Sequence, residues 1–65
     1  MTEYGKAIKK RLIDLDRPQK WLIERVKEET GLYFDDSYLG KILQGKTMTP
    51  SMVAAINKIL DVKEP

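Results

Sequence analysis

The clearest chemical pattern in this chain is a polar stripe in the segment 36–44. Five residues recur there at the helical spacings i, i+1, i+4, i+5 and i+8, on the side opposite Leu39 and Ile42. We call them the polar stripe: Asp36, Ser37, Gly40, Lys41 and Gln44. Lysine can donate hydrogen bonds to guanine O6 and N7, serine can bond a base or a phosphate, and a carboxylate can accept from cytosine N4. The stripe is therefore a candidate surface for hydrogen-bonded recognition.

A second pattern in the same region points to a different chemistry. The segment 40–47, GKILQGKT, satisfies the phosphate-loop motif G-x-x-x-x-G-K-[ST]. That motif works only as a loop between a strand and a helix inside a parallel sheet. Here Ile42 and Leu43 are in helical register, no strand pattern precedes them, and 65 residues are too few for the rest of a nucleotide hydrolase. We interpret the match as accidental and expect no nucleotide or other cofactor.

The composition leaves little room for catalysis. The chain contains no cysteine and no histidine, which excludes disulfides, thiolate zinc sites and the usual general base. Only carboxylates remain, and none of them pairs in an evident cleft. A domain of 65 residues also buries only about 60% of the surface that its unfolded chain would expose, so an interior active site has little space. We expect a single domain over 1–65 that is not an enzyme and holds no metal.

Charge and hydropathy are those of an ordinary folded domain. The hydrophobic fraction is 42% and the net charge is +2, which is only mildly basic and by itself weak support for a nucleic-acid partner. No apolar run approaches the roughly 18 residues that span a membrane, and the segment 1–4 does not resemble the start of a signal peptide. We therefore expect a cytoplasmic protein without a membrane partner.

Four segments carry apolar residues at helical spacing, which predicts an all-α fold. They cover about 2–15, 18–30, 36–44 and 50–60. Breaks separate them: a proline ends the first segment and opens the second, and a glycine follows the second and the third. Thr49 is the expected cap of the fourth. We find no strand pattern and no internal repeat, so we predict a compact bundle of four short helices and leave a fifth open.

The same spacing predicts which side chains form the core. In the first helix the inward stripe is expected to consist of Tyr4, Ile8, Leu12 and Leu15, beside Ala7. The other helices are expected to place inward Leu22, Ile23, Val26, Thr30, Leu39, Ile42, Met52, Val53, Ile56, Ile59 and Leu60.

With these elements in place, the sequence resembles the Cro/phage-repressor type (Xre-like) helix-turn-helix DNA-binding domains. The resemblance covers Ile8 to Val62 and is strongest over Ser37–Lys46, which is similar to the family's recognition helix and the glycine–lysine turn that ends it. Gln19 stands where the family usually has glutamine at the start of its second helix. Thr49 and Pro50 are similar to the start of its fourth helix.

The resemblance implies sequence-specific binding of double-stranded DNA by a transcriptional regulator of phage-repressor or Cro type. The recognition helix would be about 36–44, in the major groove, with the polar stripe facing the base edges. Phosphate contacts are implied or expected for a second set: Arg17, Gln19, Lys20, Tyr38, Lys46 and Thr47. The best rival from another class is a protein-interaction module of antirepressor type built on the same fold.

Plainer interpretations exist for the residues that matter most. Lys41 taken alone would be a solvated surface lysine, and Asp36 would stabilise the positive end of the helix dipole. Gly40 is unusual, because a glycine inside a helix costs about 1 kcal/mol relative to alanine. Gly40 indicates either that the helix backbone comes close to a partner at this position, or that the helix tolerates the small cost of a glycine there.

The sequence departs from the family pattern around the turn that names the motif. The second helix is about one turn longer, through Lys27–Thr30, and an apolar loop follows it. We expect this loop to fold back and bury Trp21 against Leu32, Tyr33 or Phe34. The alternative is an exposed aromatic patch, formed by Trp21, Tyr33 and Phe34, that binds a protein partner.

The expected oligomeric state follows from the same comparison. Many relatives dimerise through a fifth helix, and the printed sequence ends at Pro65 without one. We therefore expect a monomer in isolation, with dimers that form on DNA or through residues outside this chain.

Overall fold

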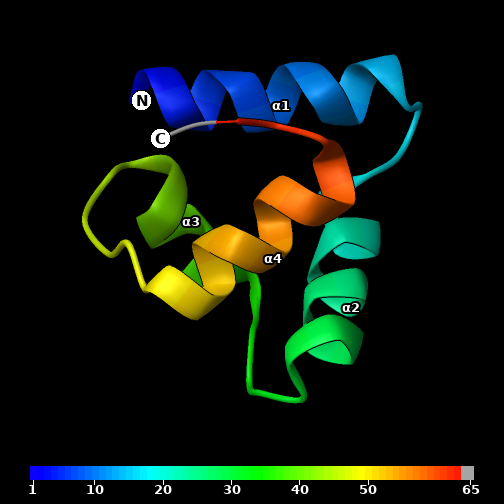
Figure 1. Cartoon of the computed structure of the whole chain (residues 1–65). Coiled ribbons are helices and arrows are strands. Elements are labelled where there is room, and N and C mark those ends of the chain that lie inside the picture. The colour runs from blue at the N-terminus through cyan, green and yellow to red at the C-terminus, as the bar shows by residue number, and fades with distance from the viewer. Residues whose placement is uncertain (64–65) are drawn as a thin grey trace.

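Helices account for all the regular structure in the part of the chain that is described. The computed structural model describes residues 1–63 and contains, over that range, α1 (Glu3–Asp14), α2 (Gln19–Thr30), α3 (Asp36–Leu43) and α4 (Pro50–Leu60), with no strand (Figure 1). The predicted all-α class is confirmed, and each boundary lies within one residue of its prediction. α4 runs between α2 and α3, with α1 along one side (Figure 1). No helix in residues 1–63 has both the length and the apolarity needed to cross a membrane.

The helix ends are capped only in part as the sequence predicts: Thr49 is the N-cap of α4, but its side chain makes no capping hydrogen bond, and the side-chain caps are those of α1 and α3. Thr2 caps α1 by accepting a hydrogen bond from the Gly5 amide at 3.0 Å, and Asp35 caps α3 by accepting from the Tyr38 amide at 2.8 Å. Gly31, which ends α2, has the left-handed φ of 69° that favours glycine. Pro18 lies one residue earlier than expected, before the first turn of α2 rather than inside it.

One continuous core holds the four helices together. It buries most of the predicted residues and also takes Phe34 from the loop. Ala7, Thr30 and Ile59 are only partly buried, and Leu15 is 38% exposed. α1 ends at Asp14 with Leu15 as its C-cap, and the chain then turns away through Asp16 at a φ of 56°.

α1 joins the carboxyl ends of two other helices. At its start, Thr2 donates to the carbonyl of Leu43 through both its amide, at 3.3 Å, and its hydroxyl, at 3.1 Å. Near its end, Arg11 Nε donates to the carbonyl of Leu60 at 2.7 Å. The last carbonyls of a helix have no partner inside the helix, so these bonds satisfy groups that would otherwise need water. Hydrogen bonds thereby link the two ends of α1 to the last residues of α3 and α4.

A buried tyrosine adds a second link between α1 and α4. Tyr4 is 4% exposed, and its hydroxyl lies 2.7 Å from Oδ1 of Asn57. Burial raises the pKa of Tyr4 to about 12, so the hydroxyl keeps its proton at any ordinary pH and donates it to Asn57.

Two helical glycines are expected to respond to alanine in opposite directions. A Cβ at Gly5 would lie 2.4 Å from the Leu43 carbonyl oxygen, whereas a Cβ at Gly40 would meet nothing within 4 Å. Gly5→Ala should therefore lower the free energy of unfolding by about 1–2 kcal/mol, because the clash exceeds the helix-propensity gain. Gly40→Ala should raise it by up to about 1 kcal/mol. Urea denaturation of both variants measures the two changes, and changes of the same sign would contradict the close packing of α1 on α3.

Candidate nucleic-acid interface

One face of α3 is buried and the other is exposed, as the sequence predicts. Leu39, Ile42 and Leu43 are buried, and the polar stripe is on the outside. Four of its members are exposed and Gly40 is partly exposed. The stripe is thus a continuous polar surface along the whole length of the helix, with no side chain at its centre.

Gly40 has no structural need to be glycine. It is helical, and a Cβ built on it would point into open space. This contrasts with Gly5, where another helix excludes any side chain. Within residues 1–63, no atom of a neighbouring element lies within 4 Å of the position that a Cβ of Gly40 would occupy.

At the start of α3, the carboxylate of Asp35 accepts two hydrogen bonds. One oxygen of Asp35 accepts from the Tyr38 amide, and the other accepts from the Tyr33 hydroxyl. The bond from the Tyr33 hydroxyl contributes most to lowering the pKa of the Asp35 carboxyl below its usual range, and the bond from the Tyr38 amide comes second. The charge of Lys41 adds a smaller effect. Asp36 is the remaining carboxylate at this end, and it is exposed without a salt bridge to any residue in 1–63.

The turn after α3 folds back onto the last turn of the helix. The amides of Lys46 and Thr47 point to the Lys41 carbonyl, at 2.8 and 3.4 Å, and Gly45 has a φ of 78°. Lys46 is exposed beside the end of the polar stripe. The segment 40–43 is helical and the two amides are occupied, so this stretch does not form a phosphate loop.

Tyr38 links α3 to the start of α4 through a side-chain hydrogen bond. Its hydroxyl lies 2.6 Å from Oγ1 of Thr49, and its ring centroid lies 5.0 Å from that of Phe34. The ring is partly buried. A phosphate would have to compete with Thr49 for this hydroxyl, which makes Tyr38 a support of the helix as well as a candidate contact.

The remaining phosphate candidates lie at the corner between α1 and α2. Lys20 and Arg17 are exposed, and Gln19 is partly exposed in the first turn of α2. In Figure 1 this corner is at the right of the molecule, whereas the turn between α3 and α4 is at the left. The structure therefore separates the predicted phosphate residues into two groups rather than one cluster.

The three loop residues expected to bury Trp21 differ in their own exposure. Leu32 and Tyr33 remain 51% and 74% exposed, and only Phe34 turns into the core. Trp21 is partly buried by the core itself, and the Arg17 guanidinium carbon lies 5.3 Å from the centre of its ring.

Comparison with protein-family models, with curated proteins and with solved structures gives no match. The resemblance to Cro-type domains therefore rests on the sequence pattern alone. Among residues 1–63, no group of three or more acidic side chains is arranged to hold a metal ion. The main feature of the candidate site is the polar, exposed face of α3, whose opposite face packs into the core.

Proposed function

We propose that this protein binds double-stranded DNA in a sequence-specific manner and regulates transcription, as a repressor of phage or Cro type does. α3 would enter the major groove, with α2 before it as the first helix of a helix-turn-helix pair. The observation that carries the proposal is the polar stripe: it is exposed along all of α3, opposite a fully buried apolar face. A major groove about 12 Å wide admits one such helix.

Each member of the stripe has a distinct role in this proposal. Lys41 donates to guanine O6 and N7, and Gln44 has the donor and acceptor pair that matches adenine. Ser37 bonds a base or a phosphate, and Asp36 accepts from cytosine N4. Gly40 allows the helix backbone to come close to the groove, which the open space around it supports.

The phosphate contacts come from the two groups that the structure separates. Lys46 and Thr47 follow α3 directly, and Arg17, Gln19 and Lys20 lie at the corner before α2. Two separated groups suit a duplex, because the two phosphate backbones run along opposite edges of the groove. In this arrangement they position α3 without reading sequence.

The distribution of charge supports the same arrangement. The segment 24–36 has five acids and two bases, a net charge of −3, whereas all other positions have ten bases and five acids, a net charge of +5. All the proposed cationic contacts belong to the basic part. The small overall charge of +2 is therefore the sum of an acidic segment and a basic remainder, and the remainder includes every lysine and arginine proposed to contact DNA.

Affinity for duplex DNA is expected to fall steeply with salt. About four phosphate contacts release enough counterions to give a slope of roughly −3 to −4 in a plot of log K against log salt concentration. Fluorescence anisotropy with a labelled duplex between low and physiological ionic strength measures this slope. A flat plot, or no binding at any salt concentration, would favour the rival function, a module that binds only proteins.

A further inference from the structure

A surface hollow at the corner between α1 and α2 combines apolar side chains with cations. It has a volume of about 200 Å³, and we call it the corner hollow; its lining residues are Lys9, Leu12, Ile13, Arg17 and Gln19. Leu12 belongs to the buried core, whereas Ile13 is 78% exposed, more than any other large hydrophobic side chain in residues 1–63. Ile13 adds little to the core, so a partner that covers it with an apolar group would gain affinity.

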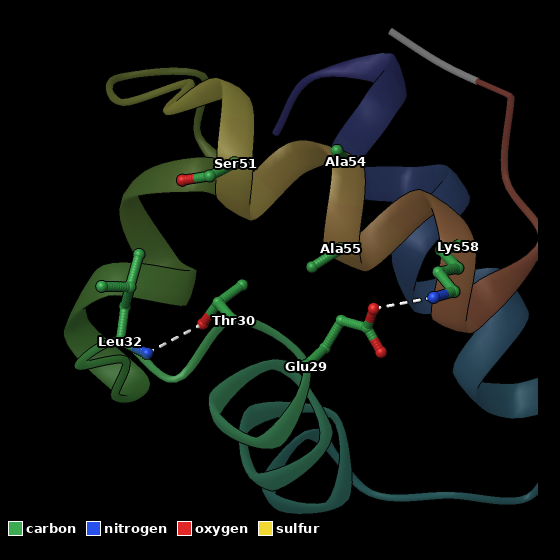
Figure 2. Close-up of a pocket in the computed structure, with 7 residues that line it drawn as sticks. All are labelled: Glu29, Thr30, Leu32, Ser51, Ala54, Ala55 and Lys58. Atoms are coloured by element: carbon green, nitrogen blue, oxygen red, sulfur yellow. Dashed lines mark hydrogen bonds and ion pairs between the residues drawn. The ribbon is translucent and has the colours of Figure 1, made fainter.

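The charges that line the corner hollow have the same sign. Lys9 and Arg17 are exposed, and neither forms a salt bridge with a residue in 1–63. One acid, Asp16, lines an adjoining hollow, so the two hollows together still have an excess of positive charge. The hollow between α2 and α4 differs, because its charged residues, Glu29 and Lys58, form an ion pair of 2.8 Å with each other (Figure 2).

Backbone hydrogen bonds and an aromatic ring hold the corner hollow in shape. The Asp16 amide donates to the Ile13 carbonyl at 3.0 Å, and the Arg17 amide donates to the Leu12 carbonyl at 2.9 Å. The guanidinium carbon of Arg17 lies 5.3 Å from the ring centre of Trp21, within the range of a cation–π interaction. A hollow that is already formed can accept a partner with little loss of conformational freedom.

We propose that the corner hollow docks an acidic amphipathic segment of a partner protein. One apolar side chain of the segment covers Ile13, and carboxylates beside it face Lys9 and Arg17. The phosphate backbone of DNA matches the two cations but offers little apolar surface to Ile13. An acidic segment with an apolar side chain matches both the charge and the apolar surface.

Docking at the corner hollow would also regulate DNA binding. Arg17 and Gln19 are proposed phosphate contacts as well, so a docked segment would exclude the duplex from this corner; this consequence rests on the proposed function. Lys9 and Ile13 line the hollow but are not among the proposed DNA contacts. Variants at these two residues therefore separate the two ligands.

A peptide titration followed by nitrogen–proton NMR and by the fluorescence of Trp21, the one tryptophan of the chain, tests the proposal. The probe is a synthetic amphipathic peptide of leucine and glutamate. One comparator has lysine in place of glutamate, and the other has serine in place of leucine. We expect amide shifts confined to 9–21 with the probe and none with the lysine comparator. The serine comparator, and the probe with Ile13→Ser or Lys9→Glu, should each bind about tenfold more weakly.

Each variant has a matched control elsewhere on the surface. Leu32→Ser removes an apolar side chain that is 51% exposed, and Lys27→Glu reverses an exposed cation of α2; neither residue lines the corner hollow. Both controls should keep the affinity of the parent protein, and all four variants should keep its folded spectrum, because the four side chains are exposed. Equal affinities of the four variants for the probe would overturn the proposal. Equal affinities of the parent for the probe and the serine comparator would also overturn it, because the hollow would then be a simple anion site.

A competition experiment separates this proposal from the proposed function. The probe should displace a labelled duplex from the parent protein and should do so about tenfold less effectively from Ile13→Ser, which should bind the duplex as the parent does. Binding of the probe with no binding of the duplex would contradict the proposed function and leave the docking site in place. Binding of the duplex with no binding of the probe would overturn the docking proposal alone.

Discussion

Phe34→Ala is expected to destabilise the protein by about 3–5 kcal/mol, the usual cost of removing a buried aromatic ring. Phe34 is 1% exposed and is the largest fully buried side chain of the core, and its ring packs against Tyr38 of α3. Total stabilities of small domains are about 5–15 kcal/mol, so the variant should be partly or wholly unfolded at room temperature. Urea denaturation followed by circular dichroism measures the change.

The neighbouring aromatic residue supplies the control. Tyr33→Ala removes a ring that is 74% exposed and should leave the urea midpoint close to that of the parent protein. If Phe34→Ala has no measurable transition, Phe34→Leu should give an intermediate midpoint, because leucine refills part of the space. Equal midpoints for the three variants and the parent would show that the loop does not anchor α3 through Phe34.

Lys41→Ala and Lys46→Ala are expected to impair DNA binding in different ways. Lys41 is exposed in the middle of the polar stripe, where it reaches base edges in the proposed complex. Its loss should weaken the preferred site by about 1–3 kcal/mol and relax the choice at one base pair. Lys46 lies in the turn after α3 and meets phosphate, so its loss should weaken all sequences alike and lower the salt slope by about 1.

Both lysines are exposed, so neither variant should alter the circular dichroism spectrum or the urea midpoint. The informative quantity is the ratio of affinities for preferred and scrambled duplexes. It should fall for Lys41→Ala and stay constant for Lys46→Ala. Equal losses on every sequence would mean that α3 does not read bases.

The local features of this fold follow directly from the sequence. Proline at the start of α4, the carboxylate cap at Asp35 and glycine at the end of α2 act within a few residues of themselves, so neighbouring residues suffice to predict them. The apolar period likewise predicts the buried face of α3, and its polar stripe follows as the opposite face.

The long-range features do not follow in the same way. The bonds from Thr2 to Leu43 and from Arg11 to Leu60 join residues more than forty positions apart, and no periodicity in the sequence indicates them. The loop shows the same limit: Leu32, Tyr33 and Phe34 are all apolar or aromatic, yet only Phe34 is buried. The one local signal is that Tyr33 stands two residues before a capping aspartate, within reach of its carboxylate.

Binding-site selection from a randomised duplex pool tests the central claim, that α3 reads DNA sequence, most directly. The selected duplex and a scrambled duplex of the same composition are then titrated at one physiological salt concentration. A reading helix predicts an enriched consensus and an affinity for the selected duplex on the order of 10³-fold or more above that for the scrambled one. A pool that shows no enrichment, with equal affinities for the two duplexes, would contradict the account.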